Sequence, residues 1–117
     1  MISLDDVLAA RERIRGNVAV TPCPQADWFS EMCGAQIYFK LENLQRTGSF
    51  KERGAANKLA MLGAQERARG VVAASAGNHA QGVAYNAQRL GMKSTIVMPE
   101  TTPLVKVLAT KKFGALV

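Results

Sequence analysis

The second half of the chain alternates short, largely apolar segments with helical patterns, and this alternation restricts the fold more than any other feature. Residues 70–75 and 94–98 have the length of buried strands, while residues 79–90 and 104–113 carry apolar side chains at helical spacing. Another apolar segment begins at Ala115. Strands joined by helices pair in parallel and are covered on both faces. We therefore predict an α/β fold with a parallel, Rossmann-like three-layer sheet and flanking helices.

The first half of the chain predicts smaller elements. Ser3 and Asp6 are typical of a helix amino-terminal cap, and the helix that they open should end near Gly16. A second, short helix is expected over residues 26–32. Residues 36–42 alternate between apolar and polar side chains, which is the pattern of a strand.

Composition is that of a soluble globular protein, with 48% hydrophobic and 21% charged residues. No apolar run approaches the roughly 20 residues that a membrane span needs. The amino terminus carries acidic rather than basic residues, unlike a signal peptide. We therefore expect a cytoplasmic protein without a membrane partner. Because the chain stops just as the apolar segment at Ala115 begins, we also expect it to be truncated.

The net charge of +6 raises the question of a nucleic-acid partner. The excess of Lys and Arg lies after Thr47, but these residues are spread over several predicted helices and loops. No aromatic residues interleave with them, as a stacking surface for single strands requires. Solvated helix faces are the simplest explanation and a pocket for anionic ligands is the second. We expect no nucleic-acid partner.

Metal binding is not expected either. Cys23, Cys33 and His79 are the only cysteines and histidine, and a structural zinc site needs four converging ligands. A reducing compartment favours two free thiols, although a disulfide between them stays open.

Ser49 and Glu52 fit a capping box at the start of a further helix. We expect that helix to run to about Leu62, with Gly63 as its carboxyl-terminal cap. Lys51 then lies in the first turn, where the positive end of the helix dipole disfavours an ammonium group and favours a nucleophilic amine. From this position alone, an ordinary exposed lysine is the better explanation.

Residues 75–82, Ser-Ala-Gly-Asn-His-Ala-Gln-Gly, connect the end of an apolar strand to the start of a helix. Ligands bind at this place in open α/β sheets because backbone N–H groups there point outward without partners. Gly77 allows a tight turn, and Ser75 and Asn78 add hydrogen-bonding side chains. The loop would suit a carboxylate or a phosphate, but a plain turn capped by Asn78 explains the pattern equally well. His79 has no carboxylate or thiol partner nearby in sequence, so no catalytic triad is predicted.

Two ordered motifs resemble those of the threonine/serine dehydratases, which are fold-type-II pyridoxal-phosphate enzymes. The first motif is residues 40–55, Lys-Leu-Glu-Asn-Leu-Gln-Arg-Thr-Gly-Ser-Phe-Lys-Glu-Arg-Gly-Ala. The second is residues 74–83, Ala-Ser-Ala-Gly-Asn-His-Ala-Gln-Gly-Val. Residues 96–99 and Lys106 match the next landmarks of the family. The resemblance covers essentially the whole chain and is greatest to the short, catabolic type of threonine dehydratase.

The resemblance implies roles for individual residues. Lys51 would bind the aldehyde of pyridoxal 5'-phosphate covalently and later act as the catalytic base. Phe50 would pack against the cofactor ring, and Asn78 would hydrogen-bond its ring hydroxyl. Arg53 and Gly54 would be structural members of the motif. The substrate carboxylate would be held by the loop residues Ser75, Ala76, Gly77, Asn78 and His79.

The reaction that the resemblance implies is a β-elimination. It would deaminate L-threonine to 2-oxobutanoate and ammonia, and L-serine to pyruvate, in threonine catabolism or isoleucine biosynthesis. The full-length protein would be a homo-oligomer with a small amino-acid substrate. Members that racemise serine carry a second serine where this chain has Ala76, so racemisation is not expected.

The resemblance also divides the chain. Residues 1–45 would belong to the large cofactor-binding domain, and residues 46–117 would be the first part of the small α/β domain. The family's glycine-rich phosphate loop and its contact to the pyridine nitrogen are not among these residues. We therefore expect the chain alone to bind cofactor poorly and to be inactive. The alternative is a non-catalytic α/β domain that binds an anion or an amino acid at the loop 75–78.

Overall fold

A computed structural model describes all 117 residues and has an α/β architecture built on a parallel sheet. β1 (Val71–Ala74) and β2 (Ser94–Val97) pair in parallel along their whole length. A bridge between Thr95 and Leu116 extends the sheet beyond β2 in the same direction. The predicted parallel α/β fold is therefore confirmed, including the strand-like start at the end of the chain.

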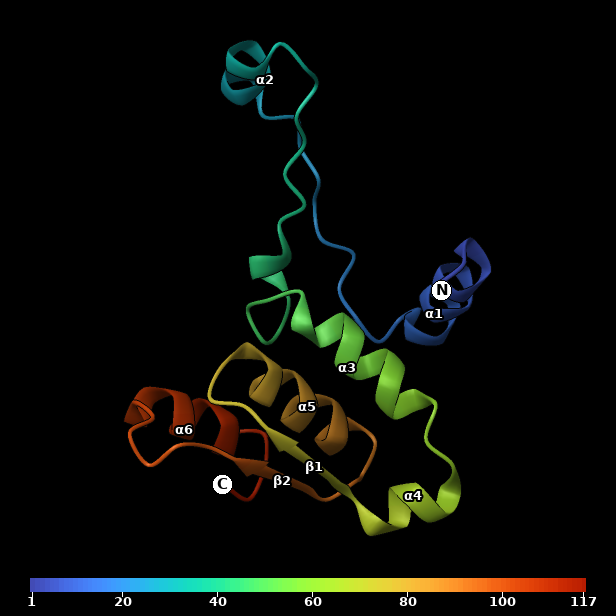
Figure 1. Cartoon of the computed structure of the whole chain (residues 1–117), viewed down its shortest axis with the longest axis vertical. Helices are drawn as coiled ribbons and strands as arrows, with labels where there is room; N and C mark the ends of the chain where they lie inside the picture. Colours follow the sequence, from blue (N-terminus) through green and yellow to red (C-terminus); the bar gives the residue numbers. More distant parts are fainter.

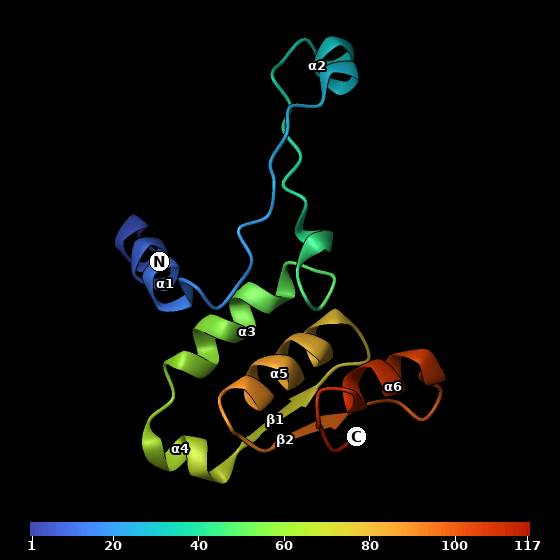
Figure 2. The same ribbon diagram turned by 180° about the vertical axis from the view of Figure 1, so that it is seen from behind.

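The helices cover one face of this sheet (Figures 1 and 2). α5 (Asn78–Arg89) connects β1 to β2, and α6 (Leu104–Lys111) packs beside it. The connections from β1 to β2 and from β2 to the segment at Leu116 follow one another in the same direction across the sheet. When two such connections are both right-handed, their helices lie on the same face. On the opposite face Val72 and Val97 are 74% and 56% exposed. Within this chain the sheet thus has helices on one face only, where the sequence predicted cover on both.

The core lies between the sheet, α5 and α3 (Lys51–Ala60), which is the helix packed most extensively against α5. Four of its six residues are alanines, so the elements approach closely; the six are Ala55, Ala80, Val83, Ala84, Ile96 and Ala115. The longest helix, α5, has only 12 residues, and no helix combines the length and apolar character that crossing a membrane takes.

Two helices near the amino terminus form as predicted. α1 (Leu4–Ile14) begins with the capping box of Ser3 and Asp6, and α2 (Asp27–Cys33) ends at Gly34, whose φ is 62°. Neither helix buries any residue.

The strand predicted over residues 36–42 was wrong. Residues 22–26 and 37–41 instead run antiparallel as an isolated ribbon, with the N–H of Ala26 bonded to the carbonyl of Ile37 and the N–H of Leu41 to that of Pro22. The ribbon has no neighbouring strand, so its alternating pattern leads to no sheet. We call residues 20–41 the arm; it projects from the rest of the chain with α2 at its tip (Figure 1).

The sequence also missed α4 (Ala64–Arg69). α3 ends at Ala60, and Gly63 opens α4 instead of closing α3, with its N–H bonded to the Glu66 carboxylate at 2.8 Å. The six residues of α4 carry no apolar stripe, so helical periodicity gives no signal for them. A 3-10 turn, η1 (Glu42–Leu44), lies at the base of the arm.

Candidate active site

Lys51 lies in the first turn of α3, as predicted; it is the first residue of the helix, and its side chain is exposed. Its Nζ lies 5.1 Å from the centre of the Phe50 ring and makes no hydrogen bond or ion pair. The predicted capping box is not formed. Phe50 is the cap residue, and Ser49 Oγ accepts a long bond of 3.4 Å from the Lys51 N–H. The amine is therefore free, while the backbone that carries it is held by other groups.

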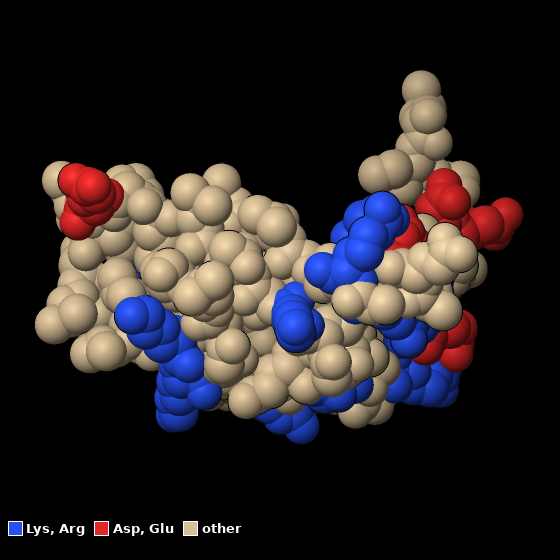
Figure 3. Space-filling view, turned by 90° about the horizontal axis from the view of Figure 1, so that it is seen from below, with Lys and Arg blue, Asp and Glu red and all other residues tan.

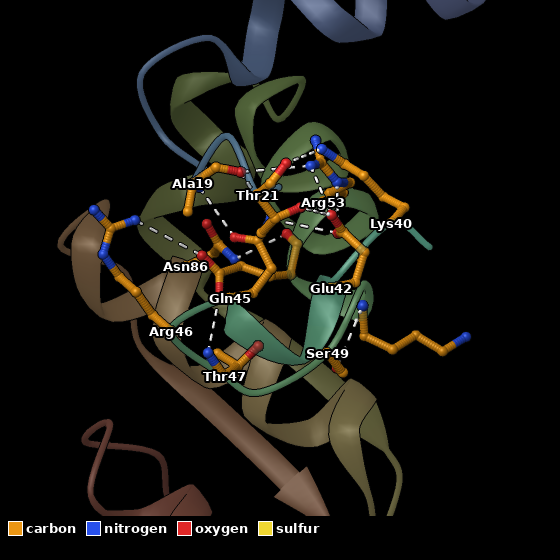
Figure 4. Close-up of polar contacts among 12 residues, drawn as sticks. Ala19, Thr21, Lys40, Glu42, Gln45, Arg46, Thr47, Ser49, Arg53 and Asn86 are labelled. Atoms are coloured by element: carbon orange, nitrogen blue, oxygen red, sulfur yellow. Dashed lines mark hydrogen bonds and ion pairs between the residues drawn. The ribbon is translucent and has the colours of Figure 1, made fainter. Parts of the chain in front are cut away.

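One of these groups is the carboxylate of Glu52, which is fully buried. Instead of turning back to Ser49, its Oε2 accepts a hydrogen bond of 2.9 Å from the backbone N–H of Thr47. Its Oε1 lies 3.8 Å from a guanidinium nitrogen of Arg46 (Figure 4). The same guanidinium lies over the ring of Tyr85 on α5, 6.0 Å from its centre. Glu52 thus ties the loop before Lys51 to the helix that follows.

A second polar cluster fixes the base of the arm to α3 (Figure 4). Glu42 accepts bonds of 2.7 and 2.9 Å from Arg53 and one of 2.6 Å from the hydroxyl of Thr21. The hydrogen bonds from Arg53, aided by that from Thr21, lower the pKa of Glu42 to about 2. Gln45 bonds both backbone groups of Ala19, at 3.0 and 2.9 Å. Arg53 therefore has the structural role that the motif predicted.

The loop after β1 leads into α5. Gly77, not Asn78, is the cap residue, and Asn78 is the first residue of the helix with its side chain exposed. The N–H of Gly77 donates to Ser75 Oγ at 3.3 Å, and the N–H of Ser75 bonds the Val97 carbonyl. An open hollow of about 480 Å³ lies at the carboxyl ends of both strands; its lining residues are Ala74, Ser75, Ala76, Val97, Met98 and Pro99. This volume is within the roughly 300–1,000 Å³ typical of small-molecule sites.

The structure brings some predicted site residues together and separates another. α3 and α5 lie side by side with their first turns at the same end (Figures 1 and 2), so Lys51 and the loop 75–78 share that end. His79 lines a different hollow of about 220 Å³ between α3, β1 and α5, together with Gly54 and Lys58. The hollow beside Ser75 does not include it.

Two residues of this region were missed by the sequence analysis. Glu52 and Asn86 are both completely buried although their residue types are mostly exposed in proteins. Asn86 falls one turn after Gly82 on the face of α5 that meets α3, and it bonds the backbone of both helices. The helical pattern of α5 counted only its apolar residues, so an amide on the buried face gave no signal.

The remaining basic side chains are not gathered into one patch on the face that Figure 3 shows. On the face shown in Figure 3 the Lys and Arg side chains stand in several separate places with uncharged atoms between them. Cys23 and Cys33 are both exposed free thiols.

Comparison with known proteins gives one consistent result. Residues 14–117 match the family described as pyridoxal-phosphate dependent enzyme. The chain is 53% identical over 115 residues to the L-threonine ammonia-lyase of Thermotoga maritima, covering 98% of this chain and 29% of that protein. It is 47% identical to the catabolic L-threonine dehydratase TdcB of Escherichia coli strain K12, covering 97% of this chain and 35% of that protein.

Among solved structures, the serine racemase of Dictyostelium discoideum superposes with a TM-score of 0.94 at 40% identity, covering 99% of this chain and 38% of that one. The chain therefore spans about a third of the length of the curated relatives that it matches.

Proposed function

The chain belongs to the family of pyridoxal-phosphate dependent enzymes, and from that premise we propose that it is the part of an L-threonine dehydratase that carries the cofactor lysine and the loop for the substrate carboxylate. The observation that carries this proposal is the exposed, unpaired amine of Lys51 on a helix turn whose backbone is fixed by buried groups. The reaction would convert L-threonine to 2-oxobutanoate and ammonia.

The residues at this end of the molecule fit the cofactor. An aldehyde needs a free amine, and Lys51 Nζ has no hydrogen-bonding partner to displace. Phe50 beside it is 61% exposed, so its ring offers a flat face to an aromatic ligand. The side chain of Asn78 is exposed at the start of α5 and would hydrogen-bond the ring hydroxyl.

The loop 75–79 suits the carboxylate of an amino acid. A Cβ atom placed on Gly77 would meet no heavy atom within 4 Å, so the space beside its backbone is open to a ligand. The half-buried hydroxyl of Ser75 lines the hollow at the strand ends. We assign binding of the substrate carboxylate to Ser75, Ala76, Gly77 and Asn78. His79 would contact the substrate from the other side of the loop, where it lines the neighbouring hollow.

Lys51 has two tasks in this proposal. Its amine would hold the cofactor, and as a free base it would accept the proton from the substrate's Cα. Bound pyridoxal phosphate supplies the electron sink that stabilises the negative charge left on that carbon. The β-hydroxyl would take up a proton and leave as water, and L-serine would be the second substrate of this elimination.

We further propose that the enzyme is a lyase without racemase activity. Ala76 lines the hollow beside Ser75 and has no proton to give or take, whereas a racemase needs a base on the opposite side of Cα. In a hybrid in which this chain replaces the matching segment of the Thermotoga maritima L-threonine ammonia-lyase, Ala76→Ser should introduce measurable formation of D-serine from L-serine, and the hybrid with the unsubstituted chain should show none. D-serine from the unchanged sequence would contradict this assignment.

The remaining assignments rest on the same family resemblance. We propose that residues 1–45 belong to the large domain and residues 46–117 to the small domain of a cytoplasmic homo-oligomer that serves threonine catabolism or isoleucine biosynthesis. The arm supports the division, since its aromatic side chains pack edge to face, Trp28 on Phe29 and Phe29 on Phe39, and yet stay 66%, 38% and 43% exposed in that order of residues.

The activity can be tested in a hybrid enzyme, in which this chain replaces the matching segment of the Thermotoga maritima L-threonine ammonia-lyase. We expect formation of 2-oxobutanoate from L-threonine, and a loss of at least about a thousandfold in Lys51→Ala. Lys58→Ala is the matched control, because Lys58 is exposed on the same helix and should be dispensable. A Lys51→Ala hybrid with full activity would reject the proposal, and a hybrid that binds L-threonine without turnover would favour the non-catalytic alternative.

A further inference from the structure

We propose that Asn86 is a positioning residue for Lys51: its buried amide fixes the first turn of α3 against α5 and so sets the direction in which the lysine leaves the helix. The inference rests on the proposed function for its catalytic consequence. Its structural part concerns the two helices alone.

The two helices meet at backbone distance beside Lys51. A Cβ atom on Gly82 would lie 3.1 Å from the carbonyl oxygen of Lys51 and 3.2 Å from its carbonyl carbon, which is tighter than ordinary van der Waals contact. Only glycine lets α5 come this close without displacing the turn that carries the lysine. By itself this contact limits the separation of the helices but does not specify the rotation of α3 about its own axis, which is one freedom of the helix.

Asn86 removes that freedom. One turn after Gly82, its Nδ2 donates to the carbonyl of Gly82 at 2.9 Å and to the carbonyl of Glu52 at 3.3 Å. The first bond is made within α5, and the second crosses to the residue directly after Lys51. A hydrogen bond to one defined carbonyl of α3 specifies the rotation of the helix as well as its distance.

Burying the amide of Asn86 at this place costs free energy of folding. The side chain is completely buried, and its Oδ1 has no hydrogen-bond partner. Gly82 and Val83, which precede it by about one turn on the same face of α5, are apolar and also buried. A buried unpaired oxygen lowers stability relative to an apolar side chain, so the contribution of Asn86 is better sought in geometry than in stability.

Glu52 receives a second anchor from the opposite side. Its carbonyl accepts from Asn86, and its buried carboxylate accepts from the N–H of Thr47 in the preceding loop. The backbone at Lys51 is thus held from α5 and from the loop, while the Lys51 amine itself stays free. A fixed backbone with a free reacting group is the arrangement that preorganised catalysis requires.

The test compares Asn86→Leu and Asn86→Ala with the control Gln88→Leu, which changes an exposed amide on the same helix. In the chain itself, hydrogen exchange reports the amides of Glu52 and Arg53, with Leu59 at the far end of α3 as internal reference. We expect Glu52 and Arg53 to exchange about tenfold faster in both Asn86 variants, as the loss of one hydrogen bond predicts, with Leu59 and the urea midpoint little changed.

In the hybrid enzyme we expect the same variants to lower kcat about tenfold, where kcat is expressed per mole of Lys51 that carries the cofactor. KM should stay within about twofold of that of the unsubstituted hybrid. The inference would be overturned if exchange at Glu52 and Arg53 did not change, or if the amide of Leu59 lost protection to the same extent. It would also be overturned if exchange at Glu52 and Arg53 became faster while kcat stayed the same. If the exchange effect holds but the unsubstituted hybrid is inactive, the proposed function fails while the anchoring of α3 stands. If Asn86→Leu does not fold, Asn86→Ala provides the same comparison.

Discussion

At the scale of single residues, the pairing of Glu42 with Arg53 makes the stability of the chain depend on pH in the acid range. Its pKa is about 2 in the folded chain and near 4.5 for an unperturbed glutamate, mainly because Arg53 donates two hydrogen bonds to it. A lowered folded pKa means that the stabilisation is complete above pH 4.5 and is lost as the pH falls toward 2. Since Arg53 is partly exposed, we expect a contribution on the order of 2 kcal/mol.

This predicts a difference between two variants in urea unfolding measured from pH 7 to pH 2.5. Glu42→Gln should be less stable than the unchanged chain at pH 7 and should approach it at pH 2.5. Glu31→Gln, which changes an exposed carboxylate of α2, should parallel the unchanged chain at every pH. A constant gap between Glu42→Gln and the unchanged chain would mean that the pair with Arg53 does not titrate as described.

Two glycines give a second prediction at this scale, because their surroundings differ while both lie in helices. Gly82→Ala would press a methyl group onto the Lys51 carbonyl and should cost about 1–3 kcal/mol. Gly54→Ala meets no heavy atom within 4 Å and should stabilise α3 by up to about 1 kcal/mol. Thermal unfolding of both variants measures the contrast, and equal effects would show that α3 and α5 are not in backbone contact.

At the scale of elements, the sequence predicted the segments whose pattern is set by the core. β1, β2 and α5 were found because apolar residues at strand or helix spacing face one buried interior. α6 was found from its helical spacing alone, since its apolar residues Leu104, Val105 and Leu108 stay exposed in this chain. The strand at 36–42 was wrong because the same alternation occurs in an exposed ribbon. α4 was missed because six polar-rich residues carry no stripe.

The same distinction applies to the site. The sequence placed Lys51 at the start of a helix and the loop 75–79 between a strand and a helix, because the boundaries of these elements could be predicted from the motifs and the apolar pattern. They did not reveal that Glu52 would leave its capping position to bond Thr47, or that Asn86 would be buried. Both facts depend on which helix packs against which, and that information is tertiary. Periodicity counts a buried amide or carboxylate as a surface residue.

The arm supplies a prediction for an element that packs on little of this chain. Trp28, the only tryptophan, is 66% exposed on α2. If residues 1–45 belong to a domain that the rest of a dehydratase completes, Trp28 should become shielded in the hybrid enzyme. Its emission should shift to shorter wavelength and its quenching by acrylamide should fall, relative to the chain alone. The spectrum of Trp28 is obtained by subtracting that of a Trp28→Phe hybrid. Equal quenching in both contexts would argue against this division into domains.

At the scale of the whole molecule, the chain is extended for its length. Its radius of gyration is 16.5 Å, against about 13 Å for a compact domain of about 100 residues. Only 19 of 117 residues are buried, and large apolar side chains are exposed on the open face of the sheet and on the arm. Such surfaces commonly bind further protein. This supports testing the catalytic proposal in the hybrid enzyme, where these surfaces have partners.

The most direct test of the account is the identity of the lysine that binds the cofactor. The hybrid enzyme is incubated with pyridoxal phosphate, reduced with borohydride, digested and mapped by mass spectrometry. We predict that the cofactor mass is found on Lys51, at close to one per chain, and that Lys58 on the same helix stays unmodified. A stoichiometric label on any other lysine, with Lys51 unlabelled, would contradict the assignment of this site.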